Sequence, residues 1–155
     1  MPLSAHERRL VEDARSATLA TVDPSERPRL VPICFVLVGD DIWSPLDEKP
    51  KTAADPRRLA RVRDILVRPA VTILVDRWSE DWTELGWVRL GGHAALVEPP
   101  DVPAAVITLL RAKYPQYADH DLEHRPVLRI AITANTSWWA AGVATDGRPS
   151  VGREP

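Results

Sequence analysis

Two lysines and a threonine, Lys49, Lys51 and Thr52, are the residues of this chain best suited to hold an anion. They follow an apolar stretch, residues 42–45, which we expect to be a strand that Pro45 ends. Two ammonium groups, a hydroxyl and loop amides can donate charge-assisted hydrogen bonds to a phosphate from several directions. The glycine-rich cradle of a P-loop is missing, so the segment predicts a different kind of phosphate site. The alternative is a solvent-exposed loop in which the lysines serve solubility alone.

A group of arginines after this loop offers a second place for an anion. Asp55 before Pro56 is typical of a helix start, and apolar residues then recur at helical spacing until Pro69. The arginines of this segment are Arg57, Arg58, Arg61 and Arg63. The first three fall near one helix face, and we take Arg57 as a candidate cofactor ligand. The alternative is a solvated helix face.

The tryptophans are the second kind of residue that suits a ligand site. Trp78, Trp82 and Trp87 surround an acidic stretch, where their rings could stack on a planar ligand or wall a cleft. Trp138 and Trp139 stand together near the end of the chain. A place in the core or in a dimer interface is the alternative for all of them. If the protein dimerises, they could also wall the pocket of a neighbouring copy.

Other chemistries find little support in the residues. Cys34, the single cysteine, sits in an apolar run where a thiol is usually a small buried hydrophobe, and it cannot form an intrachain disulfide. His120 and His124 are four residues apart in a polar segment without further ligands, so we expect no metal. No Ser/His/Asp order points to a catalytic triad.

Charge and hydropathy narrow the partners and the compartment. The net charge of -2 creates no field that favours nucleic acid, although the arginine segment leaves a nucleic-acid-binding barrel as a distant alternative. No apolar run approaches the roughly 18 residues that a membrane span needs, and the N-terminus lacks the apolar core of a signal peptide. We therefore expect a cytoplasmic protein that does not bind membranes.

The pattern of apolar residues and turns predicts a mainly β (α+β) protein. We expect six strands with two or three short helices, in a single domain over residues 1–142 and a polar, flexible tail over residues 143–155. The expected strands cover residues 17–22, 30–38, 42–45, 71–75, 84–97 and 127–133. Pro32 marks an edge or a bulge, and Gly91–Gly92 marks a kink. Because most strands are neighbours in sequence, an antiparallel barrel is favoured over a parallel sheet.

Several tracts together resemble the pyridoxamine 5'-phosphate oxidase-like split β-barrel family, the FMN-binding split-barrel type. These are residues 17–22, 29–35, 49–52, 69–76 and 87–94, and the resemblance covers about residues 8 to 140. Within the family, residues 76–82 before 85–89 are most similar to an actinobacterial branch of deazaflavin-dependent oxidoreductases.

The resemblance implies a homodimer of six-stranded split barrels, with two sites at the dimer interface for FMN or coenzyme F-420. It places the tricyclic ring along Val31, Pro32, Ile33 and Cys34, and the ribityl chain along Ser44 and Pro45. It assigns the phosphate to Lys49, Lys51 and Thr52. This agrees with the anion site inferred from the residues themselves.

The predicted function is hydride transfer between coenzyme F-420 and a small conjugated organic substrate. The C-terminal arginine-and-tryptophan motif of true pyridoxamine phosphate oxidases is missing, so pyridoxal phosphate synthesis is not expected. The arginines after Pro56 would suit the polyglutamate tail of F-420, which FMN lacks. The alternatives are an FMN-dependent oxidoreductase of the same fold and a non-enzymatic flavin or tetrapyrrole carrier. The residues name no catalytic acid.

Overall fold

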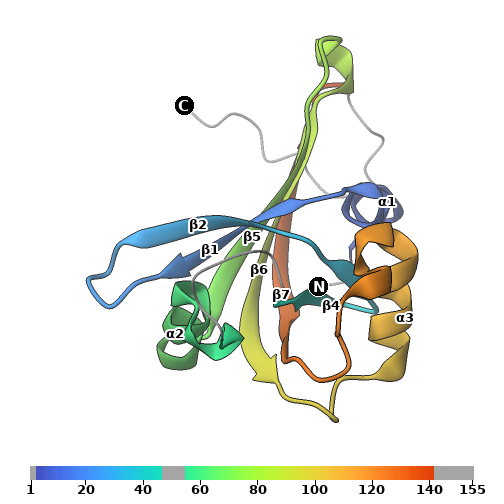
Figure 1. Ribbon diagram of the computed structural model, residues 1–155. Helices are drawn as coiled ribbons and strands as arrows, with labels where there is room; N and C mark the ends of the chain where they lie inside the picture. The colour runs from blue at the N-terminus through green and yellow to red at the C-terminus, as the bar shows by residue number, and fades with distance from the viewer. Residues whose placement is uncertain (1–2, 47–54, 142–155) are drawn as a thin grey trace.

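A single curled antiparallel sheet dominates the structure, which is a computed structural model that describes residues 3–46 and 55–141 (Figure 1). Its strands are β1 (Ala17–Val22), β2 (Pro28–Ile33), β3 (Val36–Val38), β4 (Asp41–Pro45), β5 (Ala70–Arg77), β6 (Gly86–Val97) and β7 (Val127–Trp139). They lie in the order β2-β1-β5-β6-β7-β4-β3. The mainly β architecture with short helices is therefore confirmed as a split barrel, and Pro32 lies in an edge strand as predicted.

The described residues contain seven strands, so the prediction of six is wrong. The difference arises in residues 30–38, which form two strands at opposite ends of the strand order instead of one. At the break, the N–H of Phe35 donates to Tyr114 Oη (3.0 Å), and the carbonyl oxygen of Cys34 accepts from Ser44 Oγ (2.8 Å). Side chains thus satisfy backbone groups that a continuous strand would pair with a neighbour.

Short helices precede or connect the strands and pack against the sheet. They are α1 (Ala5–Asp13), α2 (Ala60–Val67), α3 (Ala104–Lys113) and the 3-10 turns η1 (Pro56–Arg58), η2 (Trp82–Glu84) and η3 (Pro115–Asp119). The capping box of Ser4 and Glu7 at the start of α1 is confirmed. Asp55 caps η1 as expected, but the predicted helix is interrupted because Leu59 is extended (ψ 139°) and separates η1 from α2. No helix among the described residues is long and apolar enough to span a membrane.

Two apolar clusters hold these elements together. The larger one lies between the inner face of the sheet, α1 and α2, and includes Leu19, Ile73 and Leu90. The smaller one joins α3 to β3 and β4 and includes Trp43 and Leu110. Ile42 and Trp43 are neighbours on β4 but belong to different clusters, so α3 packs on the opposite face of the sheet from α1 and α2.

Strand β7 is longer than the predicted residues 127–133. Its additional residues, 134–139, pair with β6 beyond the kink at Gly91–Gly92, where the register shift is confirmed. Gly92 is required at this kink because a Cβ would stand 2.5 Å from the carbonyl oxygen of Ala131. On the inner face, Asn135 and Ser137 of β7 donate hydrogen bonds to the carboxylate of Glu7 in α1. These two polar residues of the strand thus have a buried partner on the helix.

Candidate functional site

The two predicted cofactor-lining segments on β2 and β4 meet at one hydrogen bond. Ser44 is buried, and its hydroxyl holds the carbonyl oxygen of Cys34, where the chain leaves β2. Pro45 is also buried and pairs with Val127 of β7. The structure therefore brings Cys34, Ser44 and Pro45 together.

The remaining residues of the predicted ring-lining strand point in two directions. The side chains of Val31 and Ile33 face the larger core, whereas Pro32 is exposed on the opposite face. β2 pairs only with β1 among the described strands, so its other backbone edge has N–H and C=O groups without a strand partner. A ligand ring at β2 would therefore meet Pro32 and this backbone edge.

The strand register extends the position of Pro32 across the sheet. Pro32 is opposite Thr18, Thr18 is opposite Leu74, and Leu74 is opposite Arg89. Residues that are directly opposite on neighbouring strands point to the same side. We call the surface formed by Pro32, Thr18, Leu74 and Arg89, together with the next row of Trp87 and Trp138, the outer face.

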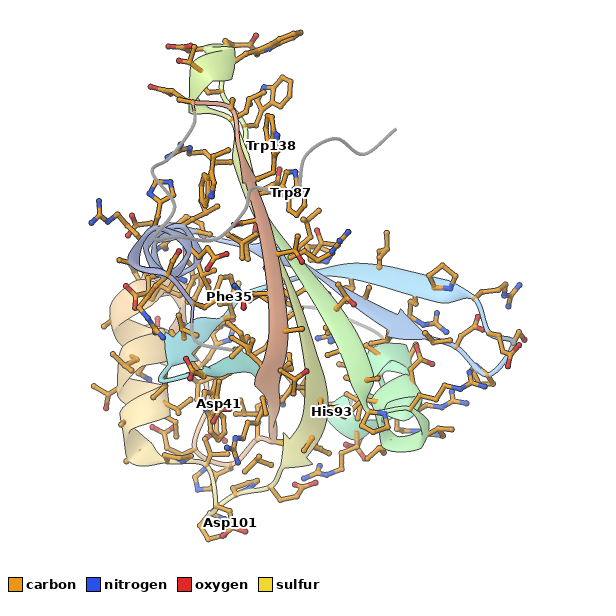
Figure 2. All side chains as sticks on the ribbon, turned by 180° about the vertical axis from the view of Figure 1, so that it is seen from behind. Phe35, Asp41, Trp87, His93, Asp101 and Trp138 are labelled. Carbon is orange, nitrogen blue, oxygen red and sulfur yellow. The ribbon has the colours of Figure 1, made fainter. Side chains whose placement is uncertain are left out.

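The neighbouring row of the outer face contains two of the predicted tryptophans. Trp87 of β6 is opposite Trp138 of β7, and both lie on the part of the sheet that extends away from α2 (Figure 2). Trp138 is 43% exposed and Leu74 is 38% exposed, so apolar surface is accessible there. The guanidinium of Arg89 lies 5.5 Å from the centroid of the Trp87 ring. Aromatic and apolar groups thus line this side of the sheet beside a cation.

The other tryptophans do not join that row. Trp139 points to the inner face, where its ring contacts His6 of α1 at a centroid distance of 4.0 Å. Trp78 and Trp82 lie at the tip of the β5–β6 hairpin and are 67% and 69% exposed. The structure therefore places the five predicted tryptophans in three separate positions.

The predicted phosphate ligands Lys49, Lys51 and Thr52 lie outside the described residues. The described residues on either side of that segment have fixed positions. On the β4 side, Leu46 accepts a 3.0 Å hydrogen bond from Arg125 Nε through its carbonyl oxygen. On the η1 side, Arg57 is held by two carboxylates, Glu98 and Asp55. The hydrogen bonds that Arg57 donates to Glu98 and, with a smaller effect, to Asp55 raise the pKa of Arg57, so it carries a full positive charge.

Sequence reasoning missed a lysine beside the predicted ring-lining strand. Lys113 Nζ at the end of α3 is buried without a hydrogen-bond partner, 4.1 Å from the centroid of the Phe35 ring. Burial, with a smaller effect of the nearby Arg15, lowers the pKa of Lys113 to about 8. Lys113 is far from Phe35 in the sequence, so no local pattern could have connected them.

Residues 3–140 match the family model described as pyridoxamine 5'-phosphate oxidase, and the chain belongs to this family. The match covers the whole of the described sheet, including both strands that meet at Ser44 and Cys34. A search of curated proteins finds no match.

Solved structures share the fold at low sequence identity. A conserved hypothetical protein of Mycobacterium tuberculosis is 21% identical, with a TM-score of 0.71 over 99% of this chain and 93% of that one. An F-420 reductase is 20% identical, with a TM-score of 0.62 over 86% of this chain and 98% of that one. The heme storage protein HutZ from Vibrio cholerae is 15% identical, with a TM-score of 0.64 over 90% and 95% of the two chains. At sequence identities this low, the similarity to these structures establishes the shared fold alone.

The chemistry of the described residues fits a flavin-type cofactor. A planar ring needs apolar or aromatic surface and a few hydrogen-bond groups, which the outer face and the free edge of β2 offer. An anionic chain needs cations, which follow β4 in the arginine segment.

Proposed function

We propose that the protein is an oxidoreductase that transfers a hydride between coenzyme F-420 and a small conjugated organic substrate, and that it acts as a homodimer. The observation that carries the proposal is the outer face. Its strand register connects Pro32 of the predicted ring-lining strand with Leu74 and with the adjacent Trp87–Trp138 pair. Apolar and aromatic side chains on this face suit a planar ring, and the lysines and arginines that follow β4 in the sequence are the candidate cations for its phosphate.

The residues have separate tasks in this proposal. The β2 edge and Pro32 orient the ring, Ser44 and Pro45 fix the strand beside the ribityl chain, and Lys49, Lys51 and Thr52 bind the phosphate. When bound, a deazaflavin supplies the hydride at C5 of its ring. The tryptophans of the outer face keep water away from the reacting groups and hold a conjugated substrate flat against the ring.

A second copy of the chain is the partner that the outer face favours. Leu74 and Trp138 are exposed large apolar residues of the outer face, and aromatic residues such as Trp138 are enriched at interface centres. In a homodimer the outer face of each copy covers that of the other. Trp138 of one copy would then wall the pocket of its partner.

Binding titrations with F-420 and with FMN test the proposal. We expect F-420 to bind at micromolar concentration or tighter and to be preferred over FMN, and reduced F-420 to be oxidised by members of a panel of enones and quinones. Binding of neither cofactor would refute the proposal. Preferred binding of FMN would instead identify the FMN-dependent alternative, and cofactor binding without turnover across the panel would identify a carrier.

The phosphate assignment needs its own variant. The double variant Lys49→Ala, Lys51→Ala should bind the cofactor about tenfold more weakly or worse, because charge-assisted bonds to a phosphate are lost. Arg9→Ala is a matched control, since it removes an exposed cation from α1. Equal affinities of the double variant and the wild type would refute the assignment.

A further inference from the structure

Arg57 and Glu98 form a two-pronged ion pair at the start of the arginine segment. Arg57 Nε lies 2.8 Å from Glu98 Oε1, and Arg57 Nη2 lies 2.5 Å from Glu98 Oε2. Asp55 accepts a further bond from Arg57 Nη1 at 3.2 Å. The guanidinium therefore presents its planar fork to a carboxylate in the geometry that arginine uses to recognise carboxylates and phosphates.

These carboxylates change what Arg57 can do for a ligand. One positive charge, that of Arg57, faces two negative charges, Glu98 and Asp55, so Arg57 presents no unpaired charge to a further anion. The hydrogen bond from Arg57 also lowers the pKa of Glu98, so this carboxylate remains ionised at neutral pH. An anionic ligand can use the Nε–Nη2 edge of Arg57 only by replacing Glu98.

The ion pair is also easy to exchange. The side chains of Arg57 and Glu98 are 44% and 45% exposed, and ion pairs in water contribute little to stability because solvent screens them. The two residues are 41 positions apart, on η1 and just after β6, so the pair links two elements that are distant in sequence. A competing carboxylate or phosphate would gain the same geometry that Glu98 has.

We propose that Glu98 is a specificity-determining residue, which competes with the carboxylates of an anionic ligand tail for the fork of Arg57. The inference rests on the proposed function, because the ligand must bring its tail to the arginine segment. A ligand that carries a polyglutamate chain exchanges one carboxylate for another at Arg57. A ligand without such a chain leaves the Arg57–Glu98 pair intact. Glu98 thereby determines how much the tail adds to the affinity of the ligand.

Cofactor titrations of Glu98→Gln test this competition. The variant keeps the size of the side chain and removes its charge. We expect it to bind F-420 with several glutamates about threefold more tightly than the wild type, and to bind F-420 without glutamates equally well. In an Arg57→Gln background, Glu98→Gln should have no effect on either cofactor. Weaker binding of the tailed cofactor by E98Q, or an equal change for both cofactors, would overturn the inference.

A second ion pair provides a matched control. Arg111 and Glu123 also form a two-pronged pair, with Nη2 2.9 Å from Oε2, but they join α3 to the segment after η3. Glu123→Gln removes the same kind of charge from the same kind of pair and should leave both cofactor affinities unchanged. A threefold gain in E123Q as well would show an effect of net charge and would overturn the inference.

An experiment without the cofactor separates this inference from the proposed function. A γ-linked triglutamate peptide is titrated into the wild type and into E98Q while the Nε–H resonance of Arg57 is followed by NMR. We expect this resonance to shift with the peptide, and to reach half of its shift at lower peptide concentration in E98Q. If the chemical shift of the Arg57 Nε–H does not change with peptide concentration in either protein, the inference is overturned. Failure of F-420 and FMN to bind the wild type refutes the proposed function and leaves the peptide result to decide on Glu98.

Discussion

The hydroxyl of Ser44 donates a 2.8 Å hydrogen bond to the carbonyl oxygen of Cys34 and thereby joins β4 to the end of β2. Ser44 is 1% exposed, so bulk solvent does not reach its hydroxyl. β2 and β4 are separated in the sheet by four other strands, and this bond connects them directly. The two segments that we assign to the ring and the ribityl chain of a cofactor depend on it for their relative position.

Ser44→Ala should therefore reduce both stability and cofactor affinity. The substitution leaves the buried carbonyl oxygen of Cys34 without its donor, which costs about 1–3 kcal/mol. Urea unfolding measures the first effect and a cofactor titration the second. Ser79→Ala is the control, because Ser79 donates a 3.0 Å bond to Glu84 on the exposed hairpin and its loss should cost little. Equal stability of S44A and S79A would contradict the role of Ser44.

Glu7 should make the protein sensitive to acid. Burial opposes its ionisation most strongly, but hydrogen bonds from Ser4, Ser137 and Asn135 together outweigh burial and hold the pKa of Glu7 below its ordinary 4.5. The unfolded chain then binds a proton at higher pH than the folded protein does. The stabilisation is fully present above pH 4.5 and is lost as the pH falls through the lower folded pKa.

Glu7→Gln tests this contribution. Its amide presents a donor where Ser4, Asn135 and Ser137 also present donors, so we expect a loss of about 1–3 kcal/mol at pH 7. The difference from the wild type should shrink as the pH falls below 4.5, since the wild type then loses the same interaction. Glu12→Gln, on the exposed side of α1, is the control. Unfolding curves of both proteins at pH 7 and pH 3.5 measure the difference in stability. The same difference at both pH values would rule out the ionised carboxylate as the cause.

Lys113 should have the opposite pH dependence. Its pKa is about 8 in the folded protein, mainly because of burial, against an ordinary value of 10.5. Below pH 8 both states are protonated and the folded protein bears the full cost of a buried ammonium group. Between pH 8 and 10.5 the folded protein releases the proton first, so its stability relative to the unfolded chain rises.

Lys113→Met should remove this cost while keeping the apolar part of the side chain over the Phe35 ring. We expect K113M to be more stable than the wild type at pH 7 by about 1 kcal/mol, with a smaller advantage at pH 9.5. The substitution also removes the cation–π contact between the ammonium group and the Phe35 ring, which limits the gain in stability. Thermal unfolding of K113M and the wild type at pH 7 and pH 9.5 measures the stability difference at each pH. A K113M protein that is less stable at pH 7 would show that the cation–π contact outweighs burial.

Local chemistry explains which parts of the fold the sequence could predict. The capping box of Ser4, the cap at Asp55, the edge position of Pro32 and the kink at Gly91–Gly92 each depend on residues that are close in sequence. The errors have distant causes. The break after Cys34 depends on Tyr114, and the extension of β7 depends on Glu7 of α1, 128 residues away from Asn135.

The candidate site follows the same rule. The strand before residues 47–54 and the capped turn after them could be read from the chain, and Ser44 and Cys34 do meet. Which tryptophans belong together could not be read, because neighbours such as Trp138 and Trp139 point to opposite faces of β7. The pairing of Arg57 with Glu98 was equally hidden, since it depends on how η1 meets the end of β6.

The proposed homodimer can be tested through the outer face. Trp138→Ala should weaken dimerisation by about 2 kcal/mol, or roughly thirtyfold, because large aromatic residues at an interface centre contribute most of the binding energy. Leu74→Glu should act more strongly by placing a charge in the apolar contact. The matched control is Leu109→Glu on α3, since Leu109 is 43% exposed, like Trp138, but lies outside the outer face. Sedimentation velocity over a concentration series measures the association. A monomeric wild type, or a dimer that L109E disrupts and L74E does not, would place the association of this protein elsewhere than on the outer face.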